Sequence, residues 1–243
     1  MGAAGVGTCR AAAGAHAAGP ALKRTRGIIP AYRCAEAVRR AAIAATSPPF
    51  LPPMTTLVVV RKHNEVAIAA DSLTTFGDTR LTAKFDRIYD KIVRYRDSYV
   101  GLCGSAAHQL VFESLLAQHK DLDLGSKAAI FETFRKLHPI LKDQHFLNPK
   151  EEEDDPYEST QITALIANGS GIFGVYSMRE VFEYTQFWAV GSGREFALGA
   201  MYALYGRLRT ATAVAKAGID AGATFDKNSG LPMTLYSLPL KSI

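Results

Sequence analysis

A threonine near the start of a β-rich segment is the residue best suited to chemistry in this sequence. Thr55 follows Met54 and opens the run Thr-Thr-Leu-Val-Val-Val. If Thr55 began the mature chain, its hydroxyl would be a nucleophile, and its own α-amine, with an unperturbed pKa of about 7.7 to 8.0, could take the proton. Hydrolysis of a peptide bond needs these two groups and donors for the developing oxyanion. Thr55 is therefore the candidate nucleophile.

An acid and a lysine stand at the ends of two further predicted strands. Asp71 closes the run Glu-Val-Ala-Ile-Ala-Ala-Asp, and Lys91 opens Lys-Ile-Val-Arg-Tyr. A lysine cation beside a hydroxyl lowers its pKa, and a buried carboxylate can hold that lysine in place. Either residue alone is more often structural than catalytic, so the hypothesis requires the two to meet at Thr55.

The elements that must position these residues follow from the hydrophobic pattern. Short β-branched runs bounded by polar turns predict strands, and longer segments with one apolar face predict helices. Pro139 should kink or end the second helix. The predicted strands are 55–60, 65–70, 91–95, 98–103, 161–167, 172–177, 181–190 and 233–238, and the predicted helices begin at 104 and span 126–144, 194–208 and 211–223.

The order of these elements indicates the fold class. Strands, two helices, strands, two helices and a last strand do not give the βαβα alternation of a doubly wound sheet. Antiparallel sheets packed face to face, with helices outside, fit the order better. We therefore expect an α+β protein with a four-layer αββα sandwich in residues 54–243, forming one domain.

The first 53 residues differ in composition from the rest. They are rich in Ala, carry seven Arg or Lys residues against one Glu, and end in Ser-Pro-Pro-Phe-Leu-Pro-Pro. Such a segment is typical of disorder, a transit peptide or a propeptide. We favour translation from Met54, with 1–53 a spurious leader, because removal of the initiator methionine would free the amine of Thr55.

Charge and composition exclude several function classes. The net charge of +5 belongs to the leader, so the body offers no electrostatic footprint for nucleic acid. No apolar run is long enough for a membrane-spanning helix. The Cys and His spacing fits no zinc site, and there is no GxxxxGK[ST] motif for ATP. We expect no metal or cofactor, and a reducing, cytoplasmic location.

Six motifs together carry a family resemblance across residues 54–240. They are Thr55 in Thr-Thr-Leu-Val-Val-Val, Asp71 in Ala-Ala-Asp-Ser, Lys91 in Asp-Lys-Ile-Val-Arg, the loop Gly101-Leu-Cys-Gly104-Ser, Ser192 in Val-Gly-Ser-Gly, and Asp226 and Ser229 in Asp-Lys-Asn-Ser-Gly. With these motifs the chain resembles the proteasome β-subunit family of threonine-type Ntn hydrolases, and within it the self-assembling bacterial homologue of β-proteobacteria. Met54 replaces the glycine that usually precedes an autoprocessed threonine, which supports Met54 as initiator.

The resemblance implies a role for each matched residue. Thr55 would be the nucleophile, with Asp71 and Lys91 tuning its hydroxyl. The remaining implied roles are oxyanion donation by the backbone N–H groups of Cys103 and Gly104, ordering of the amine by Ser192, Asp226 and Ser229, and substrate binding beside Thr75 and Gly101.

The implied activity is threonine-type endopeptidase action on unfolded polypeptides inside stacked rings of this subunit. An unfoldase or gating partner would be a separate protein. Three alternatives stay open: an amidase of the same fold acting on small amides, a ring-forming scaffold with a silent site, and a nucleic-acid binder acting through its basic leader.

Overall fold

The first two strands form the hairpin that their sequences predict. β1 (Thr56–Lys62) and β2 (Glu65–Asp71) pair antiparallel, with Leu57 opposite Ala70. The structure is a computed structural model that describes residues 54–150 and 155–241, so the predicted leader 1–53 lies outside the described residues. Within the described residues, no helix is long and apolar enough to cross a membrane.

Two antiparallel sheets form the centre of the molecule. One has the strand order β10-β1-β2-β11, the other the order β5-β6-β7-β8-β9, and a separate hairpin pairs β3 with β4. The remaining strands are β3 (Thr74–Phe76), β4 (Thr79–Leu81), β5 (Ile92–Tyr95), β6 (Ser98–Cys103), β7 (Thr163–Asn168), β8 (Gly171–Val175), β9 (Val181–Tyr184), β10 (Phe187–Gly191) and β11 (Met233–Pro239).

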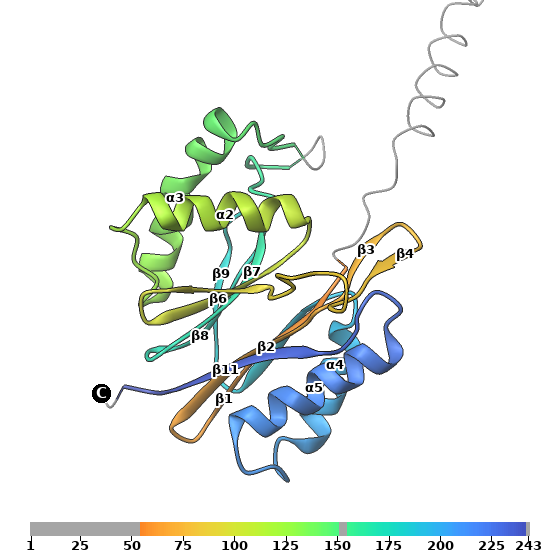
Figure 1. The fold of residues 1–243 in the computed structure, drawn as a ribbon. Coiled ribbons are helices and arrows are strands. Elements are labelled where there is room, and N and C mark those ends of the chain that lie inside the picture. Colours follow the sequence, from red (N-terminus) through yellow and green to blue (C-terminus); the bar gives the residue numbers. More distant parts are fainter. Residues whose placement is uncertain (1–53, 151–154, 242–243) are drawn as a thin grey trace, which may run out of the picture. The chain divides into compact units, whose positions relative to one another are not determined.

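Four helices cover the outer faces of the two sheets among the described residues (Figure 1). Ser105, Ser126 and Thr210 cap three of them, each accepting a backbone N–H of the first turn, as N-cap hydroxyls do. The helices are α2 (Ala106–Gln118), α3 (Lys127–Gln144), α4 (Arg194–Leu204) and α5 (Ala211–Phe225). The expected four-layer αββα sandwich of the α+β class is confirmed.

Alternation along the strands divides the core between three layers. On β1, Leu57 and Val59 face the second sheet, whereas Val58 and Val60 face α4 and α5, and all four are fully buried. Successive strand side chains point to opposite faces, so a strand buried on both faces must be apolar at every position. The uninterrupted apolar run of β1 follows from this.

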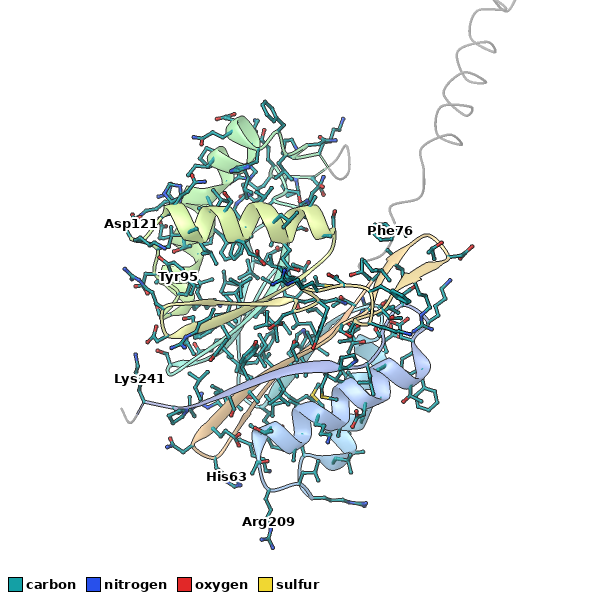
Figure 2. All side chains as sticks on the ribbon, in the orientation of Figure 1. His63, Phe76, Tyr95, Asp121, Arg209 and Lys241 are labelled. Atoms are coloured by element: carbon teal, nitrogen blue, oxygen red, sulfur yellow. The ribbon has the colours of Figure 1, made fainter. Side chains whose placement is uncertain are left out.

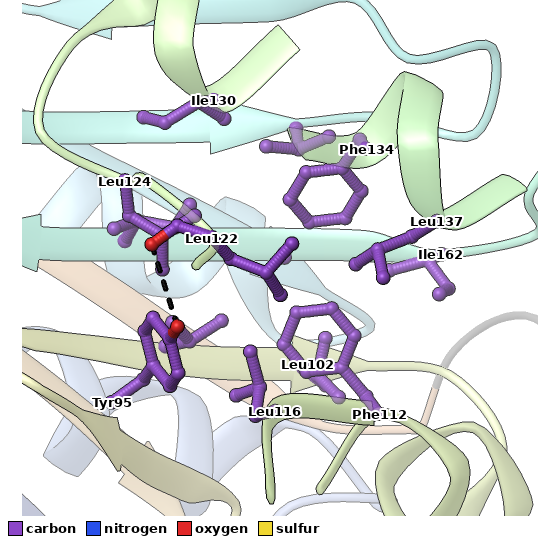
Figure 3. Packing of buried hydrophobic residues seen from close by; sticks show 14 of the residues in the cluster. Tyr95, Leu102, Phe112, Leu116, Leu122, Leu124, Ile130, Phe134, Leu137 and Ile162 are labelled. Carbon is purple, nitrogen blue, oxygen red and sulfur yellow. Dashed lines mark hydrogen bonds between the residues drawn. The ribbon is translucent and has the colours of Figure 1, made fainter. Parts of the chain in front are cut away.

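The largest apolar cluster lies under α2 and α3 and is called here the α2–α3 cluster (Figure 3). Phe112 of α2 and Phe134 of α3 are fully buried, with ring centroids 5.7 Å apart. Tyr95 enters the cluster at one side, where its hydroxyl donates to the carbonyls of His119 and Leu122. The cluster joins both helices to the five-stranded sheet.

Pro139 does not end its helix, and two other features differ from the sequence expectations. α3 runs through Pro139 to Gln144, the end predicted for it, with Leu137 and Leu141 buried on either side. The predicted strand 181–190 is two strands, because β9 ends the five-stranded sheet and the chain then crosses to β10, beside β1. The β3–β4 hairpin was not predicted.

The two ends of the β1–β2 hairpin have different surroundings. Figure 2 shows His63 at the turn end and Phe76 beyond the opposite end, on the β3–β4 hairpin. Thr55 and Asp71 belong to the end near β3, since Thr55 precedes β1 and Asp71 closes β2. The candidate chemistry therefore lies where the strands of both sheets approach the β3–β4 hairpin.

Candidate active site

Thr55 lies at the entrance to β1 and meets Lys91 there. The Lys91 ammonium donates to Thr55 Oγ1 over 2.6 Å, although the two residues are 36 positions apart. Thr55 is 3% exposed and Lys91 9% exposed. The predicted contact between the candidate nucleophile and a lysine is thus present in a buried setting.

All three protons of the Lys91 ammonium have an acceptor. Besides Thr55 Oγ1, they reach Asp71 Oδ1 over 2.8 Å and the Leu73 carbonyl over 2.7 Å. A lysine ammonium has three donors and no acceptor. Thr55 Oγ1 must therefore accept the hydrogen bond from Lys91, which leaves its own proton directed elsewhere.

Asp71 is fully buried and has four hydrogen bonds. Oδ1 accepts from Lys91 and from the Thr56 N–H over 2.9 Å, and Oδ2 accepts from the N–H groups of Leu73 and Gly230 over 3.0 Å each. A buried carboxylate is costly unless it is paired and hydrogen-bonded. These four donors saturate it, so Asp71 is a rigid support for the lysine.

A second chain of hydrogen bonds begins at the nitrogen of Thr55. The Thr55 N–H donates to Ser192 Oγ over 3.2 Å, and the Ser192 hydroxyl donates to Asp226 Oδ2 over 2.5 Å. The Ser229 hydroxyl donates to the same oxygen over 2.7 Å and lies 2.7 Å from Thr56 Oγ1. The structure thus brings Ser192, Asp226 and Ser229 together beside the Thr55 nitrogen, here called the nitrogen relay.

Glycine is required where β10 passes the threonine. Gly191 has φ 97°, in the left-handed region, and a Cβ added there would lie 2.0 Å from the Thr55 carbonyl oxygen. Only glycine combines that backbone conformation with so close an approach. Gly191 therefore allows β10 to deliver Ser192 to the Thr55 nitrogen.

The predicted oxyanion loop lies between β6 and α2. β6 ends at Cys103, and Gly104 has φ 140°, followed by Ser105, the N-cap of α2. Helix N-termini carry partial positive charge from unpaired N–H groups. Burial, the main cause, raises the pKa of Cys103 to about 12, so its thiol stays protonated at neutral pH.

The two predicted substrate-binding residues occupy different places. Thr75 is buried on β3, and its hydroxyl contacts Met54 Sδ at 2.7 Å, directly beside the candidate nucleophile. Gly101 lies within β6, where an added Cβ would be 2.5 Å from Leu57 Cδ1. The neighbours of Gly101 are therefore core side chains between the two sheets.

Sequence reasoning missed three residues that complete the site. Thr56 donates its N–H to Asp71 and places its hydroxyl beside Ser229, while Leu73 and Gly230 contribute backbone groups to Lys91 and Asp71. A hydrogen bond from a backbone N–H group does not depend on residue type, so the sequence does not reveal it. Only Thr56, a polar residue directly ahead of the apolar run 57–60, could have signalled its role.

The sequence matches no family model and no curated protein. Among solved structures, the chain is similar to BPH, a bacterial proteasome homologue from Thiobacillus denitrificans, at 40% identity and a TM-score of 0.71, covering 77% of this chain and 99% of that one. A complex of BPH with epoxomicin gives 39% identity and the same TM-score, covering 77% of this chain and 100% of that one.

A more distant neighbour shares the fold. The eukaryotic HslV of Trypanosoma brucei is 18% identical, with a TM-score of 0.57, covering 76% of this chain and 99% of that chain. At this identity the likeness concerns the arrangement of sheets and helices alone. It agrees with the four layers described above.

Proposed function

Because this chain belongs to the proteasome β-subunit family and is a threonine-type peptidase, we propose that it hydrolyses peptide bonds with Thr55 as an N-terminal nucleophile. The observation that carries the proposal is the 2.6 Å hydrogen bond from Lys91 to Thr55 Oγ1 beside a nitrogen relay on the same residue. The hydroxyl and nitrogen of one threonine are each held by a separate network.

The base is the free α-amine that Thr55 would have after loss of Met54. The Lys91 ammonium has no free lone pair and all its protons are engaged, so it cannot accept the Thr55 proton in this state. It stabilises the alkoxide that develops on Thr55 Oγ1 instead. Thr55 Oγ1 then attacks the scissile carbonyl while its proton moves to its own amine.

The nitrogen relay suits the charge that this transfer creates. An amine that gains a proton becomes an ammonium, which can donate to Ser192 as the Thr55 N–H does now. The Ser192 hydroxyl already donates to the Asp226 carboxylate, so the positive charge faces a chain of dipoles ending on a negative group. The same ammonium then protonates the departing amine, leaving an acyl-enzyme for water to hydrolyse.

The N–H groups of Cys103 and Gly104 are proposed as the oxyanion donors. Their position ahead of α2 adds the field of a helix N-terminus to any hydrogen bond they make. Because burial raises the pKa of Cys103 to about 12, its thiol stays neutral and adds no negative charge beside the developing oxyanion. Thr75, on β3 beside Met54, would border an extended peptide added alongside that strand.

We also propose the assembly and setting that the family implies. Subunits of this chain associate into stacked rings that admit unfolded polypeptides, with an unfoldase or gating protein as a separate partner in the cytoplasm. The leader 1–53 is absent from the working enzyme, because only a chain beginning at Thr55 has the free amine that the mechanism needs.

The test is the intact mass of the protein purified from its native host, before and after treatment with epoxomicin, the compound bound in the BPH complex. A chain beginning at Thr55 that gains one adduct, with Thr55→Ala gaining none, is expected. A chain beginning at Met1 without an adduct would favour the scaffold reading. An adduct accompanied by turnover of small amides alone would favour the amidase.

A further inference from the structure

Side chains from β11 and α2 bind Asp90, the residue before Lys91. The Tyr236 hydroxyl on β11 donates to Asp90 Oδ2 over 2.5 Å, and the Gln109 amide on α2 donates to the Asp90 carbonyl over 2.8 Å. Asp90 Oδ1 accepts from the N–H of Ile92 over 2.9 Å. Both carboxylate oxygens and the backbone carbonyl of Asp90 are therefore engaged.

These bonds hold the backbone from which the Lys91 side chain leaves. On the other side, the Lys91 carbonyl accepts from the Leu102 N–H over 3.3 Å. The lysine side chain has four rotatable bonds, so its three short hydrogen bonds require a well-placed backbone. Asp90 and Leu102 together fix that backbone on both sides of Lys91.

Tyr236 connects the two sheets at this point. It lies on β11 opposite Ile68 of β2, in the four-stranded sheet, whereas Asp90 leads into the five-stranded sheet. Its ring stacks on Tyr99 with centroids 4.6 Å apart, which fixes its direction. Asp71 lies on the same β2 strand, opposite Met233 of β11. The β2–β11 pair thus places both the acceptor of the Lys91 ammonium and the group that anchors its backbone.

We propose that Asp90 and Tyr236 are positioning residues for Lys91, a role that rests on the proposed function of Lys91 at Thr55. Tyr236 acts through Asp90, and Asp90 acts through the backbone of Lys91. The hydrogen bond to Asp90, with burial second, raises the pKa of Tyr236 to about 12. Its hydroxyl therefore remains a donor at every pH at which the peptidase would be assayed.

The experiment compares Tyr236→Phe with Tyr205→Phe in the protein purified with its native N-terminus. Each variant loses one hydroxyl from a ring that stays in place. The Tyr205 hydroxyl donates to the Arg61 carbonyl over 2.6 Å, toward the turn end of β1 and away from Lys91, so it is the matched control. Turnover of a fluorogenic peptide gives kcat and KM, and urea unfolding gives stability.

We expect Tyr236→Phe to lower kcat about tenfold with KM within about twofold, because a displaced lysine weakens stabilisation of the transition state more than substrate binding. Tyr205→Phe should leave both constants within about twofold. A merely structural bond would lower the unfolding midpoint of both variants without this loss of kcat. Equal kcat in the two variants would overturn the positioning role.

A double-mutant cycle tests whether Tyr236 acts through Asp90. Asp90→Ala should lower kcat at least as much as Tyr236→Phe, and Tyr236→Phe should add nothing in the Asp90→Ala background. Independent, multiplying losses would contradict the proposal. If Asp90→Ala does not fold, the comparison of the two tyrosine variants decides alone.

A Thr55→Ala sample in the same assay separates this inference from the proposed function. Activity that persists in Thr55→Ala would contradict the function, and the inference with it. Activity that depends on Thr55, together with Tyr236→Phe indistinguishable from Tyr205→Phe, would overturn the inference alone.

Discussion

The α2–α3 cluster and the site around Thr55 are both buried, but they are stabilised in different ways. Phe112 and Phe134 fill their layer by packing, and neither side chain has a polar atom that needs a hydrogen-bond partner. At the site, Asp71 and Lys91 are buried with every charged oxygen and ammonium proton in a hydrogen bond. Loss of volume in the first region lowers stability, whereas loss of one polar partner in the second leaves others unsatisfied.

Removing the Thr55 hydroxyl should have the largest effect on activity. Thr55→Ala deletes the nucleophile while leaving the Asp71–Lys91 pair intact, so we expect peptidase activity to fall by about 10³-fold or more. One buried Lys91 proton loses its acceptor, so the unfolding midpoint should fall, but by less than in a variant that breaks the Lys91–Asp71 ion pair. Activity equal to that of the unaltered protein in a pure preparation would contradict the assignment. Thr55→Ser, which keeps the hydroxyl and amine, is the matched control.

Neutralising Asp71 should damage both properties at once. Asp71→Asn leaves the buried Lys91 ammonium without its counter-charge, so the free energy of unfolding should fall by about 3–5 kcal/mol, as for other broken buried pairs. Activity of the folded fraction should fall as well. Asp121→Asn removes an exposed carboxylate and is the control. If denaturant titration gave equal stability for the two variants, Asp71 would not be a stabilising counter-charge for Lys91.

Truncation in the α2–α3 cluster should affect stability alone. Phe134→Ala creates a cavity in a fully buried layer and should cost about 3–5 kcal/mol. kcat/KM of the folded protein should be unchanged, because among the described residues no hydrogen bond to Thr55, Lys91 or Asp71 comes from α3. Phe131→Ala alters a partly exposed ring of the same helix and should cost much less. A large loss of kcat/KM in Phe134→Ala would show that the two regions are coupled.

The smallest expected effect is a pH dependence from Cys103. Burial raises the pKa of its thiol to about 12. In the unfolded chain the thiol has its ordinary pKa of about 8.5. Its contribution to stability is therefore complete below the unfolded pKa and is lost as pH rises toward 12. Urea unfolding at pH 8 and pH 10 should show a larger drop for the natural chain than for Cys103→Ala. Parallel drops would contradict the buried, neutral thiol.

Much of the fold could be predicted from local pattern. Short, continuous β-branched apolar runs predicted β1 and β2, and the capping hydroxyls Ser126 and Thr210 begin two helices near the predicted positions. The prediction of one strand over 181–190 was wrong, because the residues before and after the crossing from β9 to β10 are equally strand-like. A local period cannot tell to which sheet a strand belongs, since both sheets offer the same backbone partners.

The sequence by itself determined which residue types were available for chemistry: a threonine behind a methionine, an acid and a lysine at strand ends, and serines in glycine loops. Only the tertiary structure decided how they connect. The bond from the Thr55 nitrogen to Ser192 spans 137 positions, and the saturation of Asp71 depends on backbone N–H groups that residue type does not reveal. Hydrogen bonds form within about 3 Å, so sheet register and packing, rather than spacing along the chain, choose each partner.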